Sequence, residues 1–305
     1  ADAVAIADPE PEVREAVASE LADAVAVASL DELLELELDG IVIATPSAMH
    51  AEQAVAALER GLPVFCQKPL GRNAAETARV VAAARMHDVL LGVDLSYRHT
   101  RAMQAIAERV RAGELGRVHA IRLTFHNAYG PDKPWFYRKC ESGGGCVIDL
   151  GTHLVDLAAW VLGFPALTRV SSRLTRAGEP IGRDADECED HALAQLEFEG
   201  GCVVQLACSW RSPAGRDAVI DATFHGIHGG ATLRNVDGSF YDFVAELHDH
   251  TRTEVCVEPP DAWGGRAAID WAARLAAGQR FDPAADEFVR VAELLDAIYS
   301  NEVIR

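Results

Sequence analysis

Residues 40–47 read Gly-Ile-Val-Ile-Ala-Thr-Pro-Ser, a run of β-branched residues that stops at a Thr-Pro pair. Apolar and polar residues do not alternate in this run, which predicts a central strand of a parallel sheet, buried on both faces. The strand would end at Thr45 and Pro46, and the carboxyl ends of parallel strands are where a cofactor or substrate crevice normally lies. This stretch therefore predicts an α/β fold and places a candidate site at its strand ends.

Short strand-like runs and alanine-rich helical runs alternate through the first hundred residues, which is the pattern of a parallel α/β sheet. The predicted strands are Ala3–Ala7, Ala24–Ala26, Gly40–Ala44, Val64–Cys66 and Leu90–Val93. The predicted helices are Pro11–Glu20, Leu30–Leu34, Ala48–Arg60 and Ala74–His87. We therefore expect an α/β domain over residues 1–94.

The pattern changes after Asp94, where a single helical run, Arg101–Ala112, is followed by closely spaced strands. The predicted strands are Val118–His126, Val170–Leu174, His191–Phe198, Cys202–Trp210, Val219–Thr223 and Gly230–Arg234. Glycine-rich turns between them predict hairpins, so we expect an α+β domain with a large open antiparallel sheet over residues 95–282. A last helical run, Pro283–Tyr299, is expected to pack back onto the molecule as part of residues 283–305.

The composition is that of a globular protein, with 49% hydrophobic and 25% charged residues in a chain of 305. No apolar run approaches the ~18 residues that a membrane-spanning helix needs, and a formal net charge of -19 argues against a nucleic-acid partner. Seven scattered cysteines without a C-x-x-C pair predict reduced thiols and no metal site. The first residues lack the features of a secretory signal, so we expect a cytoplasmic protein.

The sequence Gly-Gly-Gly-Cys-Val-Ile-Asp-Leu-Gly-Thr-His-Leu-Val-Asp at 143–156 combines two acids with a histidine. In a helix that begins at about Cys146, the side chains of Asp149, His153 and Asp156 share one face, and the other faces are apolar. Unpaired ionisable groups are costly to bury, so a polar site is expected to face this stripe. The alternative is a self-satisfied Asp–His pair that only caps or orients the helix.

Three segments together resemble the family of glucose-fructose oxidoreductase, inositol dehydrogenase and MocA, which are nicotinamide-dependent sugar and polyol oxidoreductases. The segments are residues 41–70, 143–163 and 189–201, which occur in the family's order and at matching separations. The resemblance extends from Ala3 to Tyr299. It implies that residues 1–94 form a Rossmann-type NAD-binding domain and that residues 95–282 bind substrate and support oligomerisation.

The resemblance also implies the catalytic residues. Lys68 matches the family's catalytic lysine, and Asp149 and His153 match its D-x-x-x-H pair. Oxidation of a secondary carbinol requires a base for the hydroxyl proton, which would be His153, while hydride leaves for the nicotinamide. Lys68 would orient the oxygen and stabilise alkoxide charge, and Asp149 would position the imidazole or bind a substrate hydroxyl. Without the family context, Lys68 reads as a surface lysine beside a turn proline.

Asp8 closes the first predicted strand, and an acidic residue there is expected to bond the adenosine ribose, which favours NAD over NADP. The other implied cofactor residues are Thr45, Pro46, His50, Gln67, Lys68, Tyr97 and Arg98. The implied substrate residues are Lys68, Trp135, Tyr137, Asp149 and His153. Ordinary alternatives remain open: Asp8 as a cap ahead of Pro9, Pro46 as a helix first-turn residue, and Trp135 as core.

The chain departs from the family pattern in two ways. It contains no G-x-G-x-x-G loop, which in the family seats pyrophosphate at a helix N-terminus about 25–30 residues before Ala3. Either an upstream βα unit is missing, which we favour because Asp8, Thr45 and Lys68 have little reason to co-occur without a cofactor, or the pyrophosphate site is lost. The second departure is Gln67, which replaces the usual Glu and removes a charge partner for Lys68 or a ribose hydroxyl.

Three functions follow as hypotheses. The first is an NAD-dependent dehydrogenase or ketoreductase acting on a secondary alcohol or ketone of a sugar, cyclitol or related polyol. The second is an enzyme that uses bound NAD for transient oxidation during glycoside cleavage or elimination. The third is a cofactor-less sugar-binding pseudoenzyme. The sheet of residues 95–282 carries apolar residues on both strand faces, which predicts a homodimer or homotetramer unless helices cover them.

Overall fold

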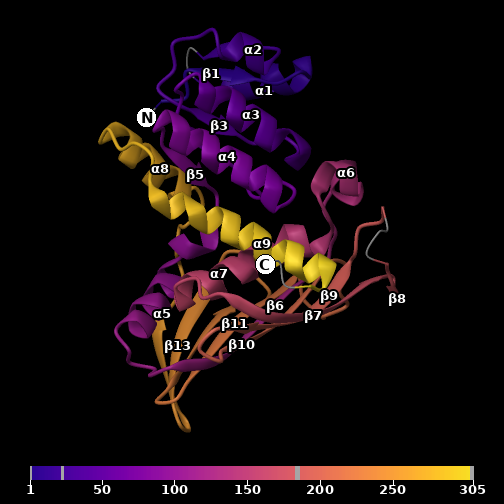
Figure 1. The fold of residues 1–305 in the computed structure, drawn as a ribbon, viewed down its shortest axis with the longest axis vertical. Helices are drawn as coiled ribbons and strands as arrows, with labels where there is room; N and C mark the ends of the chain where they lie inside the picture. The colour runs from indigo at the N-terminus through magenta and orange to yellow at the C-terminus, as the bar shows by residue number, and fades with distance from the viewer. Residues whose placement is uncertain (1, 22–23, 183–185, 303–305) are drawn as a thin grey trace.

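The computed structural model describes residues 2–21, 24–182 and 186–302. We call the part of the fold up to β5 the first half and the larger remainder, from η1 onward, the second half. The first half, indigo to purple in Figure 1, lies above a large curved sheet, and the yellow carboxyl-terminal helix runs between the two. The elements of the first half are β1 (Ala5–Ala7), α1 (Pro11–Glu20), β2 (Val25–Val27), α2 (Leu30–Leu33), β3 (Ile41–Ile43), α3 (Ser47–Glu59), β4 (Val64–Cys66), α4 (Ala74–His87) and β5 (Leu91–Val93). Every one of them matches a predicted element to within two residues.

The strands of the first half form two parallel sheets, β1–β2 and β3–β4–β5, where the sequence predicts one. The division falls at β3, which within the described part of the chain pairs only with β4. Ile41 and Ile43 are buried, but the Val42 side chain between them is 59% exposed. The expectation that this strand is buried on both faces is therefore wrong, because the face of β3 that carries Val42 is open.

The second half contains a nine-stranded sheet with helices against it. Its strands are β6 (Val118–Asn127), β7 (Leu167–Arg176), β8 (Glu179–Pro180), β9 (His191–Phe198), β10 (Val203–Ser209), β11 (Ala218–Gly226), β12 (Gly230–Asn235), β13 (Phe243–Asp249) and β14 (Arg252–Val257). Its helical segments are η1 (Ser96–His99), α5 (Arg101–Arg111), η2 (Pro134–Tyr137), α6 (Lys139–Ser142), the π-helical turn η3 (Val147–Gly151), α7 (Thr152–Leu162), α8 (Arg266–Ala276), η4 (Pro283–Ala285) and α9 (Asp286–Ser300). The sequence did not predict β13, β14 or α8.

The sheet is mixed, which corrects the expectation of an antiparallel one. Its strand order is β14-β13-β12-β11-β6-β10-β9-β7-β8, and β6 and β10 at its centre run parallel, with Ala120 opposite Val203. Hairpin-linked neighbours such as β9 and β10 are antiparallel. The parallel pair is formed by strands that are distant in sequence, and the connection between them includes α7, which contacts both.

Helices cover one face of this sheet. The α5 helix packs on β12, β13 and β14, and α7 packs on β6 and β10. The segment Lys139–Leu162 is long and apolar enough to cross a membrane by length and composition, but 83% of its apolar window is buried inside the fold, as in the core helix of a globular protein. The opposite face of the sheet is open, and Leu193 on β9 is 51% exposed there.

Two carboxyl-terminal helices connect the halves. The α8 helix falls within the residues expected to form the second domain, yet it packs on the first half. It contacts β5, and the ring centroid of its Trp271 lies 5.8 Å from that of Phe65 on β4. The α9 helix contacts α4 on one side and α7 and β7 on the other, as Figure 1 shows. The expectation that this last helix packs back is met, and it touches both halves.

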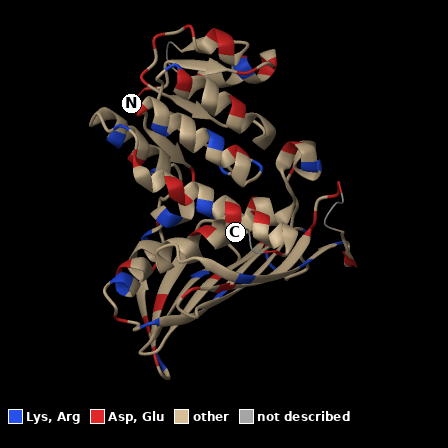
Figure 2. Cartoon of the chain, in the orientation of Figure 1, with Lys and Arg blue, Asp and Glu red and all other residues tan. Residues whose placement is uncertain are grey.

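Acidic and basic residues are interspersed over the fold. Figure 2 shows the blue Lys and Arg segments scattered among more numerous red Asp and Glu segments on helices, strands and loops. Many cations are paired locally, as in the contacts of Arg72 with Glu76 and of Arg234 with Glu246. The charge of -19 is thus spread over the surface, a distribution that favours solubility rather than attraction of a polyanion.

Candidate active site

The site forms where β4 of the first half meets the start of the long helix of the second half. Lys68 follows β4, and Asp149 lies in the π-helical turn η3 that precedes α7. Lys68 Nζ donates to Asp149 Oδ1 at 2.7 Å and to the Asp149 backbone carbonyl at 2.8 Å. Both side chains are about one-sixth exposed, at 17% and 15%, so this ion pair is only partly screened by solvent.

The π-helical turn corrects the expected helical stripe. A continuous α-helix would stack Asp149, His153 and Asp156, but the Thr152 N–H bonds to the Val147 carbonyl five residues back. The extra residue in this turn changes the rotation between Asp149 and His153. The three side chains take different environments, and the hydrogen bonds of the described residues include no self-satisfied Asp149–His153 pair.

His153 is buried beside the ion pair, and its Nδ1 atom has no hydrogen-bond partner among the described residues. Its ring packs against Tyr97, with ring centroids 4.7 Å apart. Burial, and then the positive charge of Lys68, holds the pKa of His153 well below its ordinary value of 6.5. The protonated form of this imidazole is therefore disfavoured inside the fold.

Trp210 is a partner of Asp149 that sequence reasoning missed. Its indole Nε1–H donates to Asp149 Oδ2 at 2.9 Å, so both carboxylate oxygens are held by donors. The residue follows β10, and the sequence shows it only as one more aromatic residue at the end of a strand. Its role depends on the nonlocal placement of β10 against η3.

A pocket of about 160 Å³ opens beside the Lys68–Asp149 pair. It is lined by Ala44, Thr45, Ser47, His50, Gln67, Lys68, Pro69, Trp135, Phe136, Ser142, Gly144, Ile148 and Asp149. The lining residues from Ala44 to Pro69 come from the ends of β3 and β4 and the start of α3. Those from Trp135 to Asp149 come from η2, α6, η3 and the turn between them. The predicted crevice at the strand ends therefore exists, and Thr45, His50, Gln67, Lys68, Trp135 and Asp149 lie together in it.

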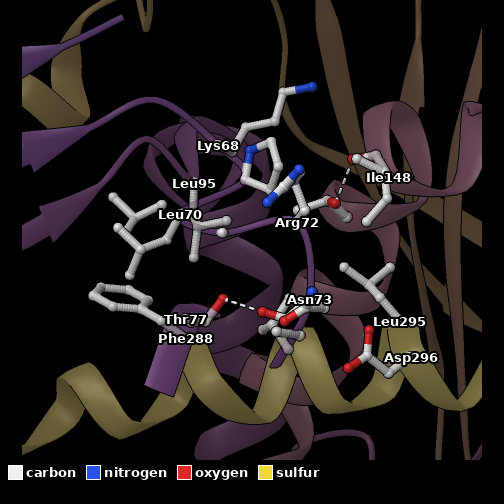
Figure 3. Close-up of a pocket in the computed structure, with 16 residues that line it drawn as sticks. Lys68, Leu70, Arg72, Asn73, Thr77, Leu95, Ile148, Phe288, Leu295 and Asp296 are labelled. Carbon is white, nitrogen blue, oxygen red and sulfur yellow. Dashed lines mark hydrogen bonds between the residues drawn. The ribbon is translucent and has the colours of Figure 1, made fainter. Parts of the chain in front are cut away.

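Lys68 also borders a smaller, mostly apolar pocket of about 30 Å³ against α4 and α9. Figure 3 shows Lys68 at the opposite end of this pocket from Phe288, Leu295 and Asp296. Phe288 and Leu295 give it apolar walls, and the Asp296 carboxylate accepts the backbone N–H of Ala74. The Lys68 ammonium is bonded to Asp149, which lines the larger pocket and not this one.

Gln67 and His50 fix the walls of that larger pocket. Gln67 Nε2 donates to Asp94 Oδ2 at 2.7 Å, so the amide that replaces the family's Glu is engaged away from Lys68. His50 Nδ1 and Nε2 lie 2.7 and 2.6 Å from the carbonyl oxygens of Pro69 and Thr45. Burial lowers the pKa of His50, while the two carbonyls oppose that effect. The charge partner of Lys68 is Asp149 rather than its sequence neighbour.

Several predicted site residues lie outside the pocket lining. Asp8 Oδ1 accepts the Glu10 backbone N–H at 2.8 Å, the geometry of the capping alternative, and Pro46 is the residue immediately before α3. The Tyr137 hydroxyl donates to the Pro131 carbonyl. Tyr97 lies in the core against Phe125, Phe243 and Trp263.

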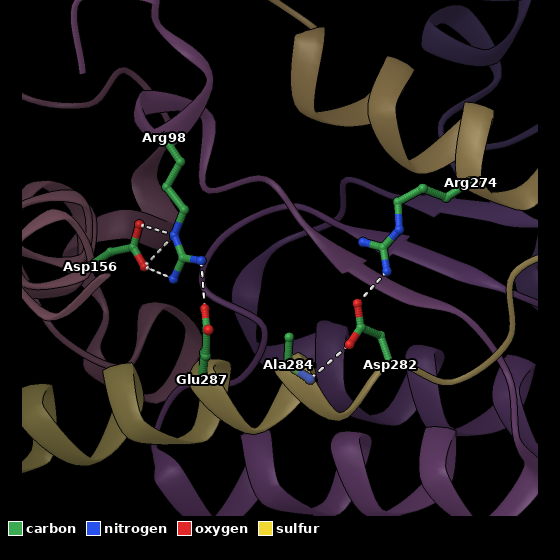
Figure 4. A network of polar contacts seen from close by, with 6 residues as sticks. All are labelled: Arg98, Asp156, Arg274, Asp282, Ala284 and Glu287. Carbon is green, nitrogen blue, oxygen red and sulfur yellow. Dashed lines mark hydrogen bonds and ion pairs between the residues drawn. The ribbon is translucent and has the colours of Figure 1, made fainter. Parts of the chain in front are cut away.

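Arg98 and Asp156 form a separate network, shown in Figure 4. Arg98 Nε lies 2.9 Å from Asp156 Oδ2, and its Nη1 lies 2.7 Å from Glu287 Oε2 of α9. Burial raises the pKa of Asp156, and Arg98 opposes that rise. The stripe that sequence reasoning assigned to one site is thus divided. Asp149 lines the pocket, His153 is buried near Lys68 but is not one of the lining residues, and Asp156 joins elements.

The residues present fit the reacting end of a nicotinamide dinucleotide and its substrate. The Lys68 ammonium and the flat ring of Trp135 line the pocket and would supply a hydrogen-bond donor and a stacking surface; the buried His153 ring, whose Nδ1 has no partner among the described residues, lies outside the lining. The sequence holds no G-x-G-x-x-G loop, so no residue is assigned to the pyrophosphate.

Comparisons with known proteins all indicate one family. A family model described as "Oxidoreductase family, NAD-binding Rossmann fold" matches residues 1–95, and the "GFO/IDH/MocA C-terminal domain" model matches residues 103–232. An Amycolatopsis mediterranei protein, provisionally named UDP-kanosamine synthase oxidoreductase subunit, is 34% identical over 68% of this chain and 61% of its own. The 1,5-anhydro-D-fructose reductase of Ensifer adhaerens is 28% identical over 69% of this chain and 61% of its own.

A solved structure shares the fold. GenD2 from gentamicin A biosynthesis, crystallised with NAD, superposes with a TM-score of 0.82 at 26% identity, over 98% of this chain and 86% of GenD2. The chain spans about three-fifths of the length of the curated relatives it matches. The two family models and the shared fold agree, and the chain belongs to the GFO/IDH/MocA family of oxidoreductases.

Proposed function

We propose that this protein is an NAD(P)-dependent oxidoreductase that moves hydride between nicotinamide and a secondary alcohol or ketone of a sugar, cyclitol or related polyol. The observation that carries the proposal is the Lys68–Asp149 pair beside a buried His153, whose Nδ1 has no partner among the described residues. Family membership supports it, as does the sugar chemistry named for relatives such as 1,5-anhydro-D-fructose reductase.

The residues divide the work of alcohol oxidation. His153 is assigned the hydroxyl proton, because its Nδ1 has no hydrogen-bond partner among the described residues. Lys68 Nζ donates a hydrogen bond to the same oxygen and stabilises its developing negative charge. Asp149 holds Lys68 through its carboxylate and its carbonyl, and Trp210 holds Asp149. A bound nicotinamide would supply the hydride acceptor for the carbinol carbon, or the hydride donor in the reverse direction.

The proposed cofactor is NAD rather than NADP. The support is the acidic Asp8 at the end of β1, where a negative charge disfavours a ribose phosphate, and the NAD bound in the related GenD2 structure. Thr45, Pro46, His50 and Gln67 are proposed to line the nicotinamide end of the cofactor, and Trp135 the substrate.

The test uses the complete gene product. NAD, NADH and NADP are titrated calorimetrically, and a panel of sugars and cyclitols is then screened for NADH formation by absorbance. Lys68→Ala and His153→Ala are expected to abolish turnover and to retain NAD binding, whereas Lys133→Ala, at a lysine 65% exposed, is the matched control. Product formation without a net change in NADH would indicate the glycoside-cleavage alternative. Absence of dinucleotide binding would indicate the sugar-binding pseudoenzyme.

We also propose that two copies pair through the open face of the nine-stranded sheet. That face carries Leu193, which is 51% exposed, beside Arg122, Gln205 and Ala207 in a shallow depression of about 530 Å³. No helix of the described ranges covers this face, and an exposed apolar face of this kind favours contact between copies. Light scattering is expected to give a dimer or tetramer for the wild type and a smaller species for Leu193→Asp. A monomeric wild type would refute this pairing.

The proposed location is the cytoplasm. All seven cysteines are free thiols, and five of them are buried. Cell fractionation with an antibody to the protein tests this directly, since recovery with an exported or membrane fraction would contradict it.

A further inference from the structure

The site helix, by which we mean the continuous helical segment η3–α7, begins next to two residues that are distant from it in sequence, Glu189 before β9 and Tyr299 in α9. A helix leaves its first four N–H groups without partners inside the helix. Here the first intrahelical bond runs from the Asp149 N–H to the Gly145 carbonyl at 3.0 Å. The N–H groups of residues 145–148 therefore need other acceptors, and all four find them outside the helix.

Glu189 accepts three of these four donors. Its carboxylate accepts the N–H of Gly145 at 3.0 Å and of Val147 at 2.8 Å, both at Oε1. Its backbone carbonyl accepts the N–H of Cys146 at 3.0 Å. Glu189 is 1% exposed, so these bonds form inside the core, where an unpaired N–H or carboxylate is costly.

Tyr299 of α9 completes the set. Its hydroxyl donates to Glu189 Oε1 at 2.8 Å and accepts the Ile148 N–H at 3.3 Å. Burial, followed by the nearby Glu189 carboxylate, raises the pKa of Tyr299 well above its ordinary value, so the hydroxyl keeps its proton. The last helix of the chain thus contacts the first turn of the site helix.

The glycine triplet at 143–145 is explained by these contacts. A Cβ at Gly144 would lie 2.0 Å from the Tyr299 hydroxyl, and a Cβ at Gly145 would lie 1.9 Å from the Glu189 carbonyl oxygen. Gly143 has a φ of +89°, in the left-handed region that favours glycine. The triplet lets Glu189 and Tyr299 approach the backbone closely.

We propose that Glu189 and Tyr299 are positioning residues of the active site: by fixing the backbone of residues 145–148, they place the Asp149 carbonyl and carboxylate on Lys68 Nζ. The geometry supports this directly, because one of the two Lys68 contacts is to the Asp149 backbone carbonyl, only one residue beyond the held N–H groups. A shift of that backbone moves the Lys68 ammonium relative to the substrate oxygen.

This inference rests on the proposed function for its kinetic consequence but not for its structural one. Two variants test it: Tyr299→Phe removes one hydroxyl and keeps the ring, and Glu189→Gln keeps the side-chain shape while replacing one acceptor oxygen with a donor. The matched controls are Tyr241→Phe, at a tyrosine 68% exposed, and Glu199→Gln, at an exposed glutamate after β9.

The first readout needs no activity. Reductive methylation of lysines, measured by mass spectrometry, reports how freely Lys68 Nζ leaves Asp149, with the exposed Lys133 as internal reference. Both variants are expected to raise Lys68 labelling several-fold relative to Lys133, and both controls to leave it unchanged. The second readout is kinetic: kcat falls, by up to about 100-fold as for an ångström-scale misplacement, while KM for NAD stays constant.

The outcomes separate the two proposals. Unchanged Lys68 labelling in both variants overturns the positioning role. The positioning role is also overturned if the labelling of Lys68 and of Lys133 rises by the same factor while the thermal midpoint falls, because that result indicates a purely structural role. If the wild type turns over no substrate but Lys68 labelling rises in the variants, the proposed function fails and the positioning role stands.

Discussion

His153 is buried, and its Nδ1 has no partner in the described part of the chain, an arrangement that costs stability. Its pKa lies well below 6.5 in the folded protein, so below pH 6.5 the unfolded chain takes up a proton that the native state does not. The wild type should therefore lose up to about 1.4 kcal/mol per pH unit from this residue as the pH falls below that value, until the folded pKa is reached.

Replacement of His153 by Phe removes this dependence and keeps a ring against Tyr97. The variant is expected to be inactive but at least as stable as the wild type at pH 7, and its stability advantage should grow between pH 6.5 and 5. Urea unfolding of both proteins at several pH values measures this. Parallel stability curves over that range would mean that His153 titrates alike in the folded and unfolded states.

Trp210 provides a second prediction at the residue scale. Trp210→Phe removes the donor to Asp149 Oδ2, and a hydrogen bond to a charged group contributes about 1.5–3 kcal/mol to stability. The expected result is a stability loss of that size together with a lower kcat. The matched control is Trp263→Phe, because Trp263 is also buried and donates its Nε1–H, but to the Tyr241 carbonyl. An equal loss of kcat in the control would contradict a specific role for Trp210.

The family resemblance singled out Lys68, Asp149 and His153, and the structure places Lys68 in contact with Asp149 and His153 near them; that these residues react stays a prediction. The sequence was uninformative about what holds them in place. Trp210 could not be found, because its partner lies 61 positions away on another element. Long-range hydrogen bonds leave no periodic signal in one sequence.

At the scale of elements, the glycine triplet decides whether the site helix can start. In Gly145→Ala the new Cβ would meet the Glu189 backbone, which cannot rotate away as a side chain could. We expect a loss of about 3 kcal/mol in the free energy of unfolding, at the upper end for overpacking, with weaker NADH-linked turnover. Gly264→Ala is the control, because nothing lies within 4 Å of its Cβ position. Equal urea midpoints for the two variants would argue against a tight contact.

Elements with a strong local period were predictable, and those defined by tertiary contact were not. The helices Pro11–Glu20 and Ala74–His87 were predicted to the residue. The π-helical turn at Val147–Gly151 was not, because its five-residue hydrogen bond interrupts a sequence whose apolar pattern suits an ordinary α-helix. The parallel pairing of β6 with β10 was missed because hairpin turns report only pairings between sequence neighbours.

At the scale of the whole molecule, side-chain contacts hold the two halves together in addition to the segments of chain that connect them. Arg98 lies just after β5, where the chain leaves the first half, and it contacts Asp156 on α7 and Glu287 on α9. Arg98 is 14% exposed and the Asp156 side chain 2%, so this pair is buried. The Arg85–Asp286 pair joins α4 to α9 in the same region, but its side chains are half exposed.

Exposure predicts very different consequences for breaking these two pairs. Arg98→Met leaves the Asp156 carboxylate buried without its partner, which should cost about 3–5 kcal/mol, whereas Arg85→Met should cost about 0–1 kcal/mol. Burial already raises the pKa of Asp156, and loss of Arg98 raises it further. The cost of Arg98→Met should therefore be larger at pH 8 than at pH 5, where the carboxyl takes up a proton more readily.

The double variant Arg98→Met with Asp156→Leu tests whether the buried charge or the lost link causes this effect. Replacing both partners by apolar side chains removes the uncompensated carboxylate, so urea unfolding should recover most of the stability and lose the added pH dependence. Glu287 is 30% exposed and can remain hydrated in both variants. If the double variant is as unstable as Arg98→Met, the link between the halves, rather than the charge on Asp156, is what Arg98 supplies.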